Sequence, residues 1–337
     1  MNFVSDNTAP AAPEIIAALN AVNAGAAAGY GEDDWSMRLD ETFGAVFEHE
    51  VRVFTVASGT AANAIALASA SPPWGAVICH REAHIECDEC GATGFFSGGA
   101  TLALVDGPAA KITPGALKAV VRNARGVHSI VPAVASVSQT TERGAVYRLD
   151  ELAALGAACR QAGLRFHMDG ARFANAIAAL GCAPAEVTWR AGVDLLSFGA
   201  TKNGALAAEA IVCFDVGMAE EIARRRKRAG HLFAKGRYAA AQLLAYFEDG
   251  LWLRLARRTN ELAARLGEAA ARYVSVPVES NQVFIKPGET ALAKLRQAGA
   301  QFYDWGGEGS GEARLVVSWH QAEAEIEAMC GLLASLR

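Results

Sequence analysis

The chain has 337 residues, of which 52% are hydrophobic and 20% are charged. This balance is typical of a globular protein with a large core, and it excludes a disordered or fibrous chain. The length corresponds to about two domains of roughly 150 residues each. A net charge of −5 at pH 7 argues against nucleic acid or an anionic membrane as the main partner, because both favour a strong basic excess.

The N-terminal segment has no basic residue before Arg38, so it lacks the features of a secretion signal or a transit peptide. The apolar runs are strand-sized, and none approaches the ~18 residues of a membrane span. The seven cysteines, an odd number spread from Cys79 to Cys330, suit reduced thiols better than a disulfide framework. We therefore expect a cytoplasmic protein without membrane segments.

Short β-rich runs alternate with helical stretches in the first part of the chain. The predicted strands are, in chain order, 51–56, 76–80, 101–105, 129–137, 165–169, 194–198 and 210–214. Helices between them have recognisable ends, such as the start at Thr113 and Pro114, and Gly163 after the helix 149–162. The alternation predicts βαβ units around a mostly parallel sheet.

After about residue 215 the pattern changes to longer helices, including 251–272, followed by strands at 283–287 and 314–319. This change predicts a smaller α+β domain at the C-terminus. We expect three parts. They are an N-terminal segment 1–13 that contributes to the site, a large domain 14–245 and a small domain 246–337.

Ser58, Gly59 and Thr60 follow a predicted strand and precede a helical stretch. At such a position, free backbone N–H groups and the positive end of the helix dipole form a cup for an anion such as phosphate. The two hydroxyls could add donors. Taken alone, the same residues are more often an ordinary Ser/Thr helix cap.

Two further residues could carry chemistry at the same sheet edge. Asp169 ends a predicted strand, where a carboxylate points into the crevice in which open α/β sheets bind ligands. Lys202 lies among small residues in SFGATKNG, 202 − 169 = 33 residues later, which is about one βαβ unit. A flat cofactor can approach such a lysine and form a Schiff base with it. The plain alternatives are that Asp169 caps the next helix, beside a surface Arg172, and that Lys202 is a solvated loop lysine.

The combination of anion cup, strand-end acid and lysine is what pyridoxal phosphate chemistry requires. Six segments then carry a resemblance to a known family: SDN at 5–7, GYGEDDW at 29–35, SGTAAN at 58–63, AHIECDECGA at 83–92, HMDGARFANA at 167–176 and SFGATKNG at 197–204. In this order they resemble the low-specificity L-threonine aldolases of the β-eliminating lyase family. The resemblance covers most of the chain and is weakest in the last third.

The resemblance implies a pyridoxal-phosphate-dependent enzyme of fold type I that cleaves L-threonine, L-allo-threonine and related β-hydroxy-α-amino acids to glycine and an aldehyde. It implies that Lys202 forms the Schiff base, that Asp169 partners the pyridine nitrogen and that His84 stacks on the ring. It also implies residues that bind the phosphate and the rest of the cofactor, namely Ser58, Gly59, Thr60 and Arg172.

The substrate carboxylate would be bound by Ser5, Arg172 and Arg314, because a guanidinium fork matches the two carboxylate oxygens. Family members are tetramers with sites near subunit borders, so the resemblance implies a homotetramer. In such an assembly Lys235 and Arg237 would reach the phosphate of a neighbouring subunit.

The chain departs from the family pattern at 139–144, where it reads QTTERG and places Glu142 at the position of a common family histidine. The group that removes the proton from the substrate hydroxyl is therefore open between His84, or a water that it positions, and Glu142. The preference between threonine and its allo isomer is open for the same reason.

Three alternatives remain beside this prediction. The same site could act on phenylserine or catalyse β-elimination. The cysteines and histidines of CHREAHIECDEC, at 79–90, could form half of a zinc site, but no second pair has the usual spacing, so no metal is expected. The run RRRKR at 224–228 could bind nucleic acid, although Glu220 and Glu221 precede it at i,i+4 spacing, as on a solvated helix face.

Overall fold

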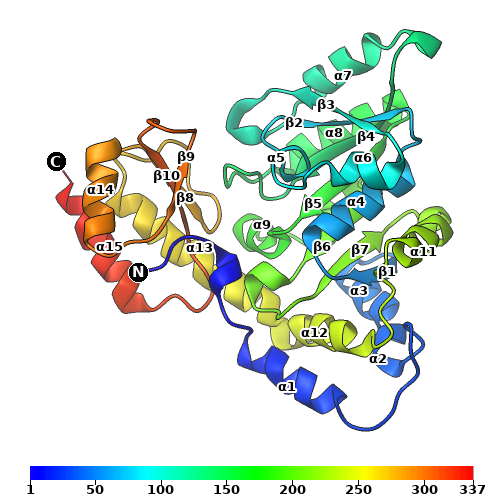
Figure 1. The fold of residues 1–337 in the computed structure, drawn as a ribbon, viewed down its shortest axis with the longest axis horizontal. Coiled ribbons are helices and arrows are strands. Elements are labelled where there is room, and N and C mark those ends of the chain that lie inside the picture. Colours follow the sequence, from blue (N-terminus) through cyan, green and yellow to red (C-terminus); the bar gives the residue numbers. More distant parts are fainter. Residues whose placement is uncertain (337) are drawn as a thin grey trace.

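The protein is described here by a computed structural model that covers residues 1–336. A seven-stranded sheet forms the centre of the larger part of the molecule (Figure 1). Its strands are β1 (Arg52–Val56), β2 (Gly75–His80), β3 (Thr101–Val105), β4 (Val131–Ser138), β5 (Arg165–Gly170), β6 (Leu195–Gly199) and β7 (Glu209–Cys213). Their order is β1-β7-β6-β5-β4-β2-β3, and only β7 runs antiparallel to its neighbours. The predicted α/β class and mostly parallel sheet are confirmed.

Helices pack on both faces of this sheet, and further helices pack on these. They are α1 (Pro13–Val22), α2 (Asp34–Met37), α3 (Leu39–Phe47), α4 (Gly59–Ala70), α5 (His84–Cys87), α6 (Ala92–Ser97), α7 (Pro114–Arg122), α8 (Leu149–Ala162), α9 (Phe173–Leu180), α10 (Pro184–Val187), α11 (Ala219–Arg228) and α12 (Arg237–Phe247). Of the further helices, α1 and α2 pack on α12. In β6, Leu195 packs with α4 and α11, whereas Leu196 and Phe198 pack on the opposite side. Because both faces are covered, strands β2, β6 and β7 are buried along their whole length rather than alternating between buried and exposed residues.

A second, smaller sheet forms its own core near the C-terminus. Its antiparallel order is β8-β10-β9, with β8 (Gln282–Ile285), β9 (Tyr303–Trp305) and β10 (Glu312–Val316). The helices around it are α13 (Leu251–Ala269), α14 (Glu289–Gln297) and α15 (Glu323–Ser335). Strand β9 is not among the predicted strands, because three residues, two of them exposed, leave almost no pattern in the sequence.

Two segments connect the two cores. Helix α13 places Leu251 and Leu255 in the large core, and Leu262 and Leu266, further along the same helix, in the small core. The N-terminal segment crosses back to the small sheet, where Phe3 is fully buried (Figure 1). Its backbone N–H donates to Gln301 O, and its carbonyl accepts from Val316 N, at 2.8 and 2.9 Å. Within residues 1–336, no helix is both long and apolar enough to cross a membrane.

The register of the large sheet gathers several predicted site residues at one edge. Ser138 pairs with Asp169, and Asp169 pairs with Ser197 on the next strand. Since β7 runs the other way, its first residue, Glu209, lies at this edge too, between Val56 of β1 and Gly199 of β6. The loops that follow the parallel strands therefore meet here, as expected for the ligand-binding edge of an open α/β sheet.

Candidate active site

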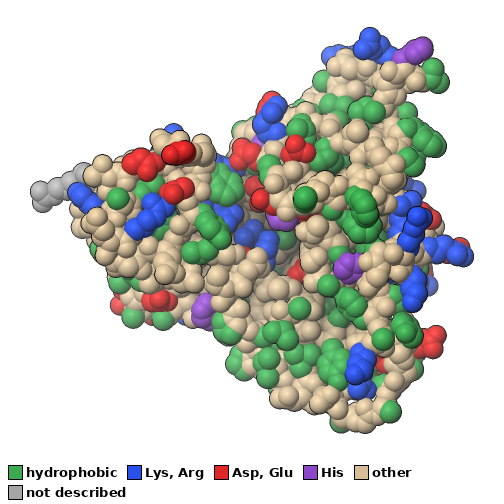
Figure 2. Space-filling view, viewed as in Figure 1, with side chains coloured by type: hydrophobic (Ala, Val, Ile, Leu, Met, Phe, Trp, Pro, Cys, Tyr) green, Lys and Arg blue, Asp and Glu red, His purple; other side chains and the backbone are tan. Residues whose placement is uncertain are grey.

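A cavity of about 370 Å³ opens at this edge of the sheet. Its wall includes the residues 58–60, His84, Glu142, Asp169 and Lys202, which the sequence placed far apart. Figure 2 shows a hollow between the two parts of the molecule, with acidic, basic and histidine side chains on its walls. The fold therefore brings seven of the predicted site residues into one cavity.

The turn at 58–60 joins β1 to α4. Ser58 is the cap of α4, and its hydroxyl accepts a hydrogen bond from Ala61 N at 3.2 Å. The first N–H groups of a helix, here those of Gly59 and Thr60, have no acceptor within the helix. The space beside the Cα of Gly59 is open, so a ligand can approach the backbone closely. Donors and space together fit a phosphate group.

Lys202 lies on a short turn, Thr201–Asn203, between β6 and β7. The next residue fixes this turn, because the Asn203 amide donates to Tyr246 Oη at 2.6 Å and to Trp252 O at 2.9 Å. On the other side, Thr201 N donates to the buried Glu209 carboxylate at 3.2 Å. Burial raises the pKa of Glu209 to about 7. The lysine thus extends into the cavity from a rigid backbone.

Asp169 is held at the end of β5 by two donors. Ala171 N binds one carboxylate oxygen at 3.0 Å, and the Asn63 amide binds the other at 2.9 Å. The same amide of Asn63 also donates to Glu89 at 2.8 Å. Asn63 thus links Asp169 to a second buried carboxylate.

Glu89 connects this network to His84, because His84 Nδ1 lies 2.8 Å from Glu89 Oε1. Burial raises the pKa of the Glu89 carboxyl, although hydrogen bonds from His84 and Asn63 oppose this shift. The hydrogen bond to Glu89 in turn raises the pKa of His84 above its ordinary value. With Nδ1 assigned as the donor to Glu89, the other ring nitrogen, Nε2, carries no proton in the neutral ring and can accept one.

Glu142 approaches the cavity from the loop after β4. Burial raises the pKa of its carboxyl, and the positive charges of Lys202 and Arg172 act in the opposite direction. Its raised pKa makes Glu142 a candidate for proton transfer in the cavity.

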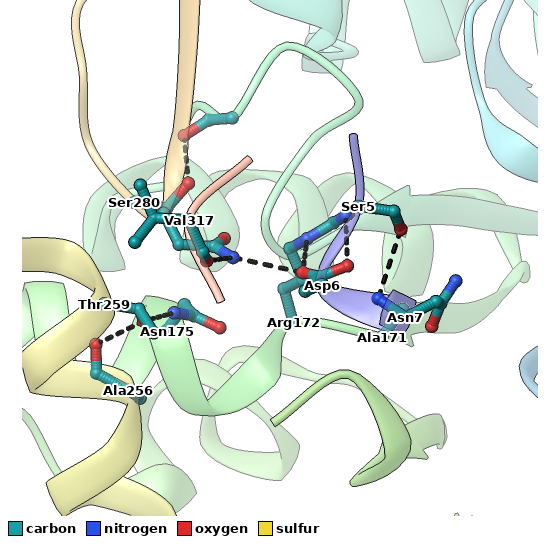
Figure 3. Close-up of polar contacts among 12 residues, drawn as sticks. Ser5, Asp6, Asn7, Ala171, Arg172, Asn175, Ala256, Thr259, Ser280 and Val317 are labelled. Carbon is teal, nitrogen blue, oxygen red and sulfur yellow. Dashed lines mark hydrogen bonds and ion pairs between the residues drawn. The ribbon is translucent and has the colours of Figure 1, made fainter. Parts of the chain in front are cut away.

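Arg172 does not present a free guanidinium. Its Nε and one terminal nitrogen bind the two oxygens of the buried Asp6 at 2.8 and 3.1 Å (Figure 3). The Asn281 amide also donates to Asp6 at 3.0 Å. Burial raises the pKa of Asp6, but the charges of Arg172 and Lys202 outweigh it, so the net pKa is lowered. The hydroxyl of Ser5 accepts from Asn7 N at 3.1 Å beside this pair.

The other predicted site residues lie outside the lining of this cavity. Arg314, on β10, lies over the rings of Tyr303 and Trp305, and its Nε is buried without a hydrogen-bond partner in residues 1–336. Burial and the charge of Arg172 lower its pKa. Arg237 donates to Gly25 O at 3.2 Å, and Lys235 lies just before α12. Neither of these two basic residues is among the lining residues of this cavity in the described chain.

The possible metal ligands group differently from the cysteine-rich pattern. In the described part of the chain, His84, Glu89 and Asp169 are the group whose ligand atoms lie within 4.8 Å of one another. The cysteines are not part of it: Cys79 is buried, and the Cys87 thiol donates to Arg81 O at 3.3 Å. The acidic pair in this group is already bridged by Asn63, so hydrogen bonding accounts for its arrangement.

A larger depression, of about 550 Å³, lies elsewhere on the large sheet, beside Arg165 at the amino end of β5. Of its two arginines, Arg160 and Arg165, the second is already paired with Asp194 and Asp215 at 3.0 and 2.6 Å. It contains no lysine, and its histidine, His49, stacks on Trp189. This depression is the larger of the two, but the side chains of the cavity at Lys202 are better suited to catalysis. We therefore take the cavity at Lys202 as the candidate active site.

Sequence reasoning assigned no role to Asp6, Asn63 or Glu89. All three lie inside the segments that carried the resemblance, at 5–7, 58–63 and 83–92. Asn63 also gave a signal of its own, because it is a polar residue in an otherwise apolar buried helix. Their partners, however, follow only from the fold.

A lysine on a fixed turn, a carboxylate at a neighbouring strand end and a helix start open to phosphate fit pyridoxal phosphate, and they define a pyridoxal-phosphate-dependent enzyme. The chain belongs to the β-eliminating lyase family, whose model matches residues 2–288.

Comparison with individual known proteins shows which members of this family the chain resembles. It is 44% identical over 328 residues to a low specificity L-threonine aldolase from Pseudomonas sp. (strain NCIMB 10558), covering 96% of this chain and 94% of that protein. It is 42% identical over 339 residues to one from Pseudomonas aeruginosa, covering 99% and 96%. The structure of Leishmania major threonine aldolase matches with a TM-score of 0.93 and 28% identity over 98% of each chain. The family expected from the sequence motifs is confirmed.

Proposed function

We propose that this protein is a low-specificity L-threonine aldolase that cleaves L-threonine, L-allo-threonine and related β-hydroxy-α-amino acids to glycine and an aldehyde. The observation that carries this proposal is the meeting of Lys202, Asp169 and His84 in one cavity beside the phosphate-sized turn at 58–60. Near-full-length similarity to L-threonine aldolases supports the choice of reaction.

Pyridoxal phosphate is the cofactor, and the residues of the cavity fit its three functional groups. Lys202 would bind its aldehyde, Asp169 its pyridine nitrogen and the turn at 58–60 its phosphate. When bound, the cofactor withdraws electrons from the substrate Cα. His84, whose ring the bond to Glu89 orients, would stack on the cofactor.

The substrate carboxylate needs a cation that can donate two hydrogen bonds. Arg314 supplies an unpartnered guanidinium Nε, and its position against two aromatic rings limits its motion. Arg172 keeps one terminal nitrogen that Asp6 does not bind. We assign carboxylate binding to these two arginines together with Ser5.

Cleavage of the bond between Cα and Cβ requires a base that removes the proton of the β-hydroxyl. The free ring nitrogen of His84 can accept this proton, while Nδ1 remains bound to Glu89. Glu142, on the same cavity wall, is the second candidate. A His84→Asn variant with undiminished cleavage activity would assign the proton to Glu142.

We also propose that the enzyme is a cytoplasmic homotetramer. Seven unpaired thiols suit a reducing compartment. Lys235 and Arg237, which stay away from the cavity of their own chain, would then lie near the phosphate of a neighbouring subunit. Light scattering of the purified protein measures the assembly size, and a monomer would contradict this part of the proposal.

The function is tested by aldehyde release from L-threonine and from L-allo-threonine with added pyridoxal phosphate. We expect the wild type to release acetaldehyde and glycine, and Lys202→Ala to fall to the background level because it cannot hold the cofactor aldehyde. Phenylserine and β-elimination substrates are assayed in parallel, since elimination releases ammonia and a keto acid instead of glycine. Release of those products, with no aldehyde from either threonine isomer, would contradict the aldolase function.

A further inference from the structure

The basic run at 224–228 forms the last turns of α11 but does not present one uniform face. Arg224 and Arg225 pair on the surface with Glu220 and Glu221, each at 2.6 Å. Arg226 instead points inward, toward the end of β1. Its Nε donates to Thr55 O at 2.7 Å and its terminal nitrogen to Thr55 Oγ1 at 2.8 Å. The expectation of a solvated helix face is therefore wrong for Arg226.

The guanidinium of Arg226 has no acidic partner within residues 1–336. Its hydrogen bonds all go to neutral oxygens, the third being to His231 O at 3.2 Å. Burial lowers the pKa of Arg226 to about 10, which still leaves it charged at neutral pH. A partly buried cation without a counter-charge is unfavourable. Such an arrangement is stabilised when an anion binds nearby.

The residues bound by Arg226 lead directly to the turn at 58–60. Thr55 lies in β1, three residues before Ser58. His231, which accepts from Arg226 with its backbone carbonyl, also accepts a hydrogen bond from Ala57 N at its ring Nδ1, at 3.3 Å. Ala57 and Ser58 both line the cavity. Arg226 and His231 thus bind the backbone at Thr55 and Ala57, immediately before the turn.

His231 does not add a second positive charge to that of Arg226. Burial and the neighbouring Arg226 lower its pKa, so its ring is neutral at physiological pH. A neutral ring can accept the Ala57 N–H bond, as it does here. Of these two side chains that hold the backbone before the turn, Arg226 therefore carries the charge.

We propose that Arg226 is a positioning residue for the cofactor phosphate, fixing the backbone before the turn at 58–60 and supplying a permanent positive charge behind it. This inference rests on the cofactor site described above. Within the basic run, Arg226 would then act on the phosphate, and the remaining residues of the run lie at the surface. Arg226 acts through Thr55 and His231 and does not itself contact the phosphate.

The test compares the affinity of the cofactor-free protein for pyridoxal phosphate and for pyridoxal, which has the same aldehyde and ring but no phosphate. Binding is followed by the visible absorbance of the ligand attached to Lys202. For Arg226→Gln we expect at least a tenfold loss of affinity for pyridoxal phosphate and less than a twofold change for pyridoxal. The matched control is Arg224→Gln, which removes the same charge from the exposed side of α11 and should leave both affinities unchanged.

Equal losses for the two ligands in Arg226→Gln would mean that Arg226 only maintains the fold locally, and no loss would mean that it does not act on the phosphate. Either result overturns the proposal.

Arg226→Lys provides a second measurement if Arg226→Gln does not fold. It keeps the charge, so the ratio of the two affinities must stay within about threefold of the wild type, and a tenfold drop would contradict the proposal. Threonine cleavage is not measured, so the result is independent of the Lys202→Ala assay.

Discussion

His84 shows how one hydrogen bond can set the charge state of a catalytic candidate. Its bond to the buried Glu89 raises its pKa, so its protonated form persists to higher pH than in an isolated histidine. Only the neutral ring can accept the proton of the substrate hydroxyl. If His84 is the base, activity must be lost as the pH falls through this raised pKa and be retained above it.

Glu89→Gln should therefore move the acidic limb of the pH–activity profile to lower pH. The introduced amide can still accept hydrogen bonds from His84 and Asn63 through its oxygen, but it carries no negative charge to stabilise the imidazolium. Removal of one adjacent charge corresponds to a shift of about one pH unit. The measurement is kcat/KM for L-threonine between pH 5 and about 9. Glu86→Gln, an exposed change on α5, the short helix that carries His84, is the control. If the acidic limb does not move in Glu89→Gln, Glu89 does not control the protonation of His84.

At the scale of elements, local chemistry determines most of the boundaries that could be predicted. The Thr113 hydroxyl accepts from Ala116 N at 3.2 Å and caps α7, as the Thr-Pro pair predicts. Gly163 ends α8 in the left-handed region with φ +67°, again as predicted. These signals lie within a few residues of the boundary they determine.

Two glycine substitutions test this point, because we expect them to change the free energy of unfolding in opposite directions. Gly163→Ala should lower the free energy of unfolding by about 1–2 kcal/mol, because a left-handed conformation is unfavourable for alanine. Gly115→Ala, in the first turn of α7, has ordinary helical geometry and room for a methyl group, so it should stabilise by about 0.4–1 kcal/mol. Urea unfolding measures both. Equal effects of the two changes would show that backbone conformation is not what distinguishes these positions.

The candidate site was predictable only where a residue's role follows from its own motif. Lys202, Asp169 and the turn at 58–60 could be identified because each ends or follows a recognisable strand. The ion pair of Asp6 with Arg172 joins residues 166 positions apart, and the bond of Asn63 to Asp169 spans 106 positions. Periodicity and caps carry no information over such separations. Similarly, Arg226 could not be told from its exposed neighbours, because only the packing of α11 against β1 turns it inward.

At the scale of the whole molecule, α13 makes the stability of each core depend on the other. One continuous helix of 19 residues contributes buried leucines to both, so neither core can lose its part of α13 without strain on the other. The predicted boundary between large and small domains at residues 245 and 246 stays a prediction, and it falls within the last turn of α12, a few residues before this shared helix.

Leu266→Ala, in the small core, should therefore destabilise the whole chain. Leu266 is fully buried, and such a truncation costs about 2–5 kcal/mol. We expect one unfolding transition, with far-UV circular dichroism and tryptophan fluorescence changing at the same urea concentration. Two separate transitions, with only one shifted by the substitution, would show that the cores unfold independently.

The location of the N-terminal segment has a consequence for biosynthesis. Phe3 needs Gln301 and Val316 as backbone partners, and Asp6 needs Asn281. A ribosome makes Phe3 and Asp6 some 15 seconds to a minute before these partners, at about 5–20 residues per second. Until then the segment cannot dock. Phe3 and Asp6 thus reach their native place only after these much later segments have been made, and until then Arg172 lacks its counter-ion.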